Sequence, residues 1–138
     1  MSRRERQADH SLPKFLNGIR ANTLEFFEII SHSNVGPESF LALNCHQDSL
    51  LELRLSSLRT ASVVALSMLK GCTSLKLLHL EVLYGTIDLE SVQNDAFLEI
   101  IAWLRDCKRL QDISLKGFSG PAILTPLLLE NHIRLQRV

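Results

Sequence analysis

Residues 72–80 read Cys-Thr-Ser-Leu-Lys-Leu-Leu-His-Leu, and residues 107–115 read Cys-Lys-Arg-Leu-Gln-Asp-Ile-Ser-Leu. Both stretches follow one template, in which a leucine is followed by apolar residues three and five positions later. Earlier copies of the template are Leu24, Phe27, Ile29 and Leu50, Leu53, Leu55, and a fifth copy begins at Leu135. The leading leucines are 26, 25, 35 and 25 residues apart. The chain therefore contains an internal repeat, and 27 of its 138 residues are leucine.

The segments between the templates carry helix signals. Within residues 95–106, Phe97, Ile100, Ile101 and Leu104 fall at positions i, i+3, i+4 and i+7, which is one face of a helix. Helix-starting residues precede the other segments: a Gly-Pro pair at 36–37 and at 120–121, and a capping threonine at position 60. We therefore expect helices at about 37–44, 61–70, 95–106 and 121–130, with a degenerate first copy at 11–20.

The templates themselves predict half-buried strands, because apolar and polar residues alternate from Leu110 to Leu115. No single helix–strand unit can bury its apolar face alone, whereas stacked units bury a continuous core. Three of the four spacings lie within the period of about 20–29 residues of leucine-rich repeats. We predict an α/β fold, a leucine-rich-repeat solenoid in the form of a short horseshoe with a parallel concave sheet. A doubly wound α/β fold is the alternative, but its strands are covered on both faces and should be nearly all apolar.

The two quoted stretches resemble the cysteine-containing, ribonuclease-inhibitor-like class of leucine-rich repeats. Residues 103–110 look like the repeat region of fungal F-box proteins. The resemblance covers about residues 11–138 and implies a substrate-recruiting part of a ubiquitin-ligase subunit. Two positions depart from the class: His132 stands where the template has cysteine, and Cys45 is displaced in a longer unit. An F-box ahead of the repeats is missing, although residues 12–16 echo the opening of one.

Length and composition indicate one domain. We expect a disordered tail at 1–10 and a repeat domain at 11–138, with four to five units and the last one incomplete. Fifteen basic and fifteen acidic residues cancel, which argues against general binding to nucleic acid or to a membrane surface. Three cysteines cannot all pair within the chain and indicate a reducing compartment, so we expect an intracellular protein, cytoplasmic or nuclear.

The alternating strand positions predict a binding surface on the concave face. Neighbouring strands should align these positions in ladders, and a mixture of both charge signs with apolar residues suits a protein partner. The charge pairs Glu28–Arg54 and Glu81–Lys116 also have an ordinary structural interpretation as cross-strand pairs. The three expected ladders are Phe26, Glu52, Leu77, Asp112 and Arg137; Glu28, Arg54, His79 and Ser114; and Ile30, Ser56, Glu81 and Lys116.

The 35-residue unit carries about ten additional residues, 84–93, at one rim of the predicted sheet. Insertions on solenoids map to loops that often bind, so Tyr84, Asp88 and Glu90 are candidate partner contacts. A tolerated surface insertion is the alternative. The last template ends within a strand at Val138, which suggests a piece of a longer repeat protein, a short protein capped by a partner, or self-association through an open sheet edge.

The sequence contains no motif that supports catalysis. No pair of cysteines or histidines has a metal-ligand spacing such as Cys-x-x-Cys, and the glycines lack a phosphate-binding context. Cys72 and Cys107 hold the same phase of the repeat and are interpreted as packing residues. We therefore expect a protein–protein interaction module with no catalytic residue, metal or cofactor. The alternative is a structural fragment or regulatory decoy with no ligase role.

Overall fold

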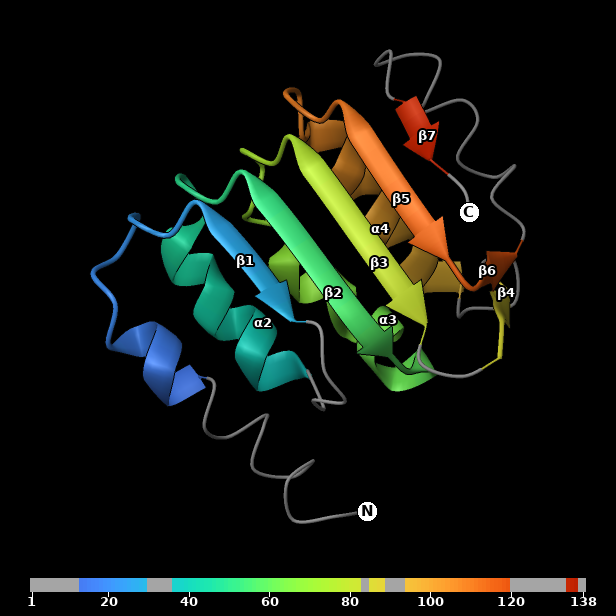
Figure 1. The fold of residues 1–138 in the computed structure, drawn as a ribbon, viewed down its shortest axis with the longest axis horizontal. Coiled ribbons are helices and arrows are strands. Elements are labelled where there is room, and N and C mark those ends of the chain that lie inside the picture. Colours follow the sequence, from blue (N-terminus) through green and yellow to red (C-terminus); the bar gives the residue numbers. More distant parts are fainter. Residues whose placement is uncertain (1–12, 30–35, 83–84, 89–93, 120–133, 137–138) are drawn as a thin grey trace.

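The structure, a computed structural model, describes residues 13–29, 36–82, 85–88, 94–119 and 134–136. Its centre is an open sheet in which every pair of neighbouring strands is parallel and the strand order follows the order of the chain (Figure 1). The five strands are β1 (Phe26–Ile29), β2 (Glu52–Leu58), β3 (Leu77–Val82), β5 (Asp112–Lys116) and β7 (Arg134–Gln136). The prediction of an α/β fold with a parallel sheet is confirmed.

The described helices lie behind the sheet, on one of its two faces (Figure 1). Because the strand order never reverses, the sheet also lacks the switch point at which a doubly wound fold places its ligand. The opposite face of the sheet carries no helix among the described residues. The helices between the strands are α2 (Pro37–Leu43), α3 (Thr60–Ala65) and α4 (Asn94–Asp106), with 3-10 turns η1 (Asn44–His46) and η2 (Leu66–Leu69).

Two of the expected helices are shorter than the sequence pattern indicates. The pattern predicts helix over 37–44 and 61–70, but α2 and α3 end early and continue as η1 and η2. A 3-10 turn rises about 2.0 Å per residue against about 1.5 Å in an α-helix, so these segments reach the next strand with fewer residues. The expected helix at 95–106 is confirmed as α4, and the one at 121–130 lies outside the described residues.

The core is the layer between the sheet and the helices. Leading leucines of the templates, such as Leu50 and Leu75, are fully buried at the strand entrances. Full burial of a leucine side chain contributes roughly 1.5–3 kcal/mol, so these repeated positions dominate the stability of each unit. The inward strand positions are equally buried, at Leu53, Leu55, Leu78, Leu80, Ile113 and Leu115.

The register of the last strand differs from the expectation. The structure pairs Ile113 with Leu135 and Asp112 with Arg134, so Arg134 rather than Arg137 continues the first ladder. In the register, Leu135 thus corresponds to Ile113, the fourth residue of its template, and not to the leading leucine. The C-terminal copy of the template contains only two apolar residues, Leu135 and Val138, which are three positions apart. Such a pair fits the template in more than one way, so the sequence does not show which template position Leu135 takes. Residues 137–138 lie outside the described part of the chain.

The third ladder is present only in part. Glu81 is paired with Lys116 as expected, but the register between β2 and β3 shifts between Leu55 and Leu58. In β2 these leucines are three positions apart, whereas their partners in β3, Leu80 and Val82, are two positions apart. Ser56 therefore lies in an irregular part of the strand, and position 30 is not described. Within the described residues, no helix is long and apolar enough to cross a membrane.

Candidate functional site

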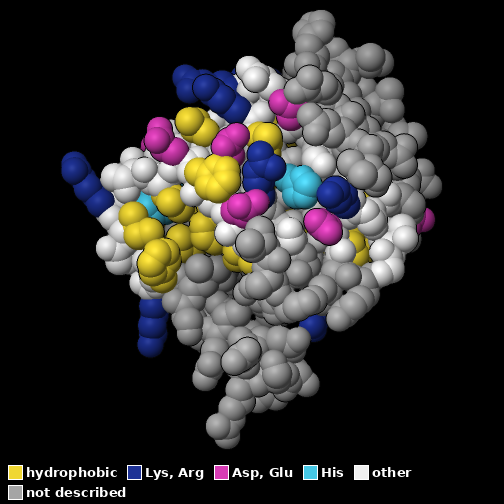
Figure 2. All heavy atoms as spheres, viewed as in Figure 1, with side chains coloured by type: hydrophobic (Ala, Val, Ile, Leu, Met, Phe, Trp, Pro, Cys, Tyr) yellow, Lys and Arg dark blue, Asp and Glu magenta, His cyan; other side chains and the backbone are white. Residues whose placement is uncertain are grey.

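The face of the sheet that the helices leave uncovered is the candidate functional site, and we call it the open face. Figure 2 shows charged side chains and a histidine gathered over its central strands, with hydrophobic side chains beside them toward the N-terminal strand. Successive strand residues point to opposite faces, so the residues between the buried leucines emerge here. The register places these residues of the open face in line: Phe26, Glu28, Glu52, Arg54, Leu77, His79, Glu81, Asp112, Ser114 and Lys116. Ser114 is buried, so the expectation that it contacts a partner is not supported by its exposure.

The strand register brings these ten residues into rows that cross the sheet. The first and second rows confirm the expected ladders over β1, β2, β3 and β5. Neighbouring strands lie about 4.8 Å apart, so side chains next to one another in a row are within contact range. The rows are Phe26–Glu52–Leu77–Asp112, Glu28–Arg54–His79–Ser114 and Glu81–Lys116.

Arg54 lies over the ring of Phe26 on the open face. The guanidinium carbon is 6.0 Å from the ring centroid, at the outer limit of a cation–π contact. The sequence suggested Glu28 as the partner of Arg54, and these two residues are register neighbours. The structure instead places the guanidinium group diagonally, toward an aromatic ring that is still 46% exposed. No sequence signal identifies such a diagonal contact, because it depends on side-chain direction.

His79 occupies the middle of the second row. Its Nε2 atom lies 3.8 Å from the Oε2 atom of Glu81, two residues further along β3. Burial lowers the pKa of His79, and the positive charges of Lys116 and Arg54 lower it further, against the opposite effect of Glu81. An imidazole with a lowered pKa is predominantly neutral at pH 7.

The insertion at the rim of the sheet forms a second, smaller sheet. Strand β4 (Ile87–Asp88) pairs in parallel with β6 (Phe118–Ser119), and Ile87 and Phe118 are both buried. The insertion is thus anchored in the core, and sequence reasoning missed this, although an isoleucine among polar residues was the available signal. Asp88 is exposed, whereas Tyr84 and Glu90 lie outside the described residues, so the role of this rim in binding stays a prediction.

The helix-to-strand junctions form a regular ladder of hydrogen bonds. The Sγ atom of Cys72 donates to the Oδ1 atom of Asn44 at 3.4 Å, and Cys45 contacts Asn17 in the same way at 3.7 Å. Cys45 lies five residues before Leu50, whereas Cys72 lies three residues before Leu75, as the displacement expected from the longer unit implies. Cys45 is also exposed, whereas Cys72 and Cys107 are buried.

The junctions are structural rather than reactive. Burial raises the pKa of the Cys72 and Cys107 thiols to about 12, which suppresses the nucleophilic thiolate. His46 is also fully buried and accepts a hydrogen bond from the backbone of Leu24 at its Nδ1 atom. In the parts of the chain that the structure describes, no three His, Cys, Asp or Glu residues lie together as a metal site would need.

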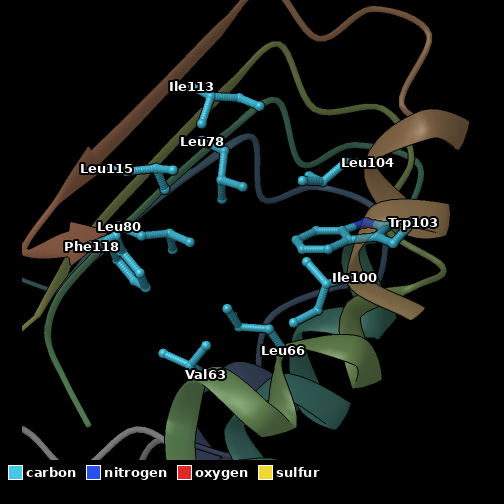
Figure 3. Close-up of a pocket in the computed structure, with 10 residues that line it drawn as sticks. All are labelled: Val63, Leu66, Leu78, Leu80, Ile100, Trp103, Leu104, Ile113, Leu115 and Phe118. Carbon is cyan, nitrogen blue, oxygen red and sulfur yellow. The ribbon is translucent and has the colours of Figure 1, made fainter. Parts of the chain in front are cut away.

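Two hollows lie away from the open face. The first is an apolar cavity of about 30 Å³ between the sheet and the helices, and Figure 3 shows side chains from both layers pointing into it. It is a packing void that is too small for an organic ligand. The second is a groove of about 470 Å³ on the helical side, lined by Leu41, Asn44, Gln47, Ser67, Met68, Lys70, Gly71 and Glu99.

Comparison of the chain with protein-family models, with curated proteins and with solved structures finds no match. The functional conclusion therefore depends on the fold and on the open face alone. The resemblance to F-box repeat proteins stays an expectation from the quoted sequence stretches.

Proposed function

We propose that the protein is a leucine-rich-repeat solenoid that binds a protein partner through the open face of its sheet. Three features support a solenoid: a strand order that follows the chain, helices on one face, and the burial of the leading leucines Leu50, Leu75 and Leu110. The observation that carries the binding proposal is the strand register, which gathers nine charged, polar and apolar side chains that are at least partly exposed on one face, beside the buried Ser114.

A protein suits this face better than a nucleic acid does. Phosphate backbones are bound mainly by clustered lysine and arginine, whereas the open face carries two such residues, Arg54 and Lys116, beside four carboxylates. Phe26 and Leu77 add apolar area that a protein side chain can cover. Apolar side chains with polar and charged residues around them match the apolar core and polar rim of a protein interface.

Affinity capture with two matched variants tests the proposal. The first variant, Leu77→Ala with His79→Ala, truncates two side chains at the centre of the open face. The second, Leu98→Ala with Glu99→Ala, truncates two exposed side chains on α4, on the helical side. We expect the first to lose a partner that wild type and the second variant retain, with Trp103 fluorescence showing that all three are folded. Retention of the same partner by the first variant would contradict the proposal.

The finer proposal, from the resemblance, is recruitment of a substrate to a ubiquitin ligase. Co-purification of ligase subunits with the captured partner would support this role. A partner that binds without such subunits would favour a regulatory decoy instead. The expectations of no enzymatic activity, no cofactor and an intracellular location stay predictions.

A further inference from the structure

We propose that the partner docks a cationic segment on the open face, and that Phe26, Glu28 and Glu52 bind one of its arginine or lysine side chains. We call these three residues the β1 corner. The inference depends on the proposed function, because it specifies the chemistry of the partner that the open face takes.

The open face is acidic although the chain as a whole is neutral. On strands β1, β2, β3 and β5, Glu28, Glu52, Glu81 and Asp112 give four negative charges against two positive ones, a net charge of two negative, while the formal net charge of the whole sequence is zero. Arg134 continues the first row on β7, beside Asp112 and on the far side of the sheet from β1. His79, with its lowered pKa, adds little positive charge at pH 7. Charge complementarity across an interface governs partner choice and association rate, so this face selects a basic segment.

The β1 corner combines an aromatic ring with two carboxylates. Glu52 is the register neighbour of Phe26, and Glu28 lies two residues along the same strand and on the same face. Phe26 is 46% exposed and Glu28 is exposed, on the first strand of the sheet order. An aromatic face beside carboxylates is a favourable site for a guanidinium or ammonium group, through cation–π and charge-assisted hydrogen bonds.

The chain already holds a cation at this corner. The Arg54 guanidinium carbon lies 6.0 Å from the Phe26 ring centroid, so an arginine side chain fits against the ring within the existing packing. Arg54 is therefore a stand-in for the partner's cation and a competitor of it. Lys116, the other cation of the open face, is the register neighbour of Glu81, two strands away from β2.

Peptide binding measured by fluorescence anisotropy tests the inference. The probes are a labelled nine-residue peptide with three Arg-Leu-Ser repeats and the matching peptide with glutamate in place of arginine. We expect the arginine peptide to bind wild type and the glutamate peptide not to bind. In a Glu28→Gln, Glu52→Gln variant the arginine peptide should bind about tenfold more weakly or worse, since charged hydrogen bonds contribute about 1.5–3 kcal/mol each.

Further variants separate the effect of the β1 corner from the effect of the net charge of the protein. Glu38→Gln with Glu99→Gln deletes two carboxylates on α2 and α4 and should leave the affinity for the arginine peptide within about twofold. Arg54→Gln should tighten binding by severalfold because it vacates the Phe26 ring. Lys116→Gln makes the same change in charge and should tighten binding less.

Three results would overturn the inference: equal weakening by both double carboxylate variants, a preference for the glutamate peptide, or binding of neither peptide. None of these results bears on the capture experiment, which alters Leu77 and His79 and not the β1 corner. If the Leu77→Ala, His79→Ala variant alone loses the partner and the arginine peptide does not bind, the open face is still the binding site. The proposal that the partner docks a cationic segment is then rejected.

Discussion

The indole Nε1 atom of Trp103 donates a hydrogen bond of 2.9 Å to the carbonyl oxygen of Cys72. The Sγ atom of Cys107 lies 3.5 Å from the same oxygen. This oxygen belongs to the junction before β3, whereas both donors belong to the next unit, in α4 and just after it. The contact therefore joins two consecutive units across the core, and Trp103 is only 1% exposed.

Replacing this indole should destabilise the protein. We expect Trp103→Phe to lower the free energy of unfolding by about 1–3 kcal/mol, because the buried Cys72 carbonyl keeps only the weak thiol donor. Urea unfolding followed by circular dichroism measures the loss. Leu98→Ala, on the exposed side of the same helix, is the control and should change stability by less than about 0.5 kcal/mol. Equal stability of Trp103→Phe and wild type would show that the hydrogen bond contributes nothing.

The three thiols should differ in reactivity with a disulfide reagent. Cys45 is exposed, while Cys72 and Cys107 are fully buried. We expect one thiol per chain to react in the native protein and all three in denaturant. A Cys45→Ser variant should then show no rapid reaction without denaturant. Rapid reaction of two or three thiols in the folded protein would show that Cys72 or Cys107 is accessible at the surface.

Stability should decline at alkaline pH. Burial raises the pKa of Cys72 and Cys107 from 9.0 to about 12, so between these values the folded chain keeps protons that the unfolded chain has released. Their contribution to the free energy of unfolding is present below pH 9 and is lost as the pH rises toward 12. For each thiol the loss is at most about 1.4 kcal/mol per pH unit. Urea midpoints from pH 8 to 11 measure the decline. It should be shallower in a Cys72→Ala, Cys107→Ala variant, and an equal decline in both would refute the assignment to these thiols.

Gly117 should tolerate a side chain less well than Gly85. Both glycines have positive φ, 79° and 69°, so either alanine variant adopts a strained backbone that costs about 1 kcal/mol. At Gly117 an added Cβ would also lie 2.8 Å from the Cβ atom of Val82, whereas at Gly85 nothing lies within 4 Å. We therefore expect Gly117→Ala to lower the thermal midpoint further than Gly85→Ala does. The opposite order would contradict the packing of the turn before β6 against β3.

The apolar cavity offers a stabilising substitution. Val63 lines it from α3, and Figure 3 shows its side chain directed into the void. Val63→Ile adds one methylene to a space of about 30 Å³ and should raise the free energy of unfolding by about 0.5–1 kcal/mol. Val63→Ala, which enlarges the cavity, should lower it. Destabilisation by isoleucine would mean that the void cannot take the larger side chain.

Much of the open face could be predicted because strand periodicity is a local property. Once Leu78 and Leu80 face the core, Leu77 and His79 must emerge on the other side. The paired positions of β2, β3 and β5 then follow from the constant distance between each leading leucine and its strand. The same counting failed at β7, where the incomplete template left the phase of Leu135 undetermined.

The sequence by itself determined the repeat, the inward leucines and the mixed charged and apolar character of the open face, since each follows from spacing along the chain. Only the tertiary structure decided how separate units meet. The pairing of β4 with β6, the contact of Cys45 with Asn17 and the position of Arg54 over Phe26 all depend on contacts between residues far apart in the chain. Such contacts are set by three-dimensional packing, which residue spacing within one unit does not encode.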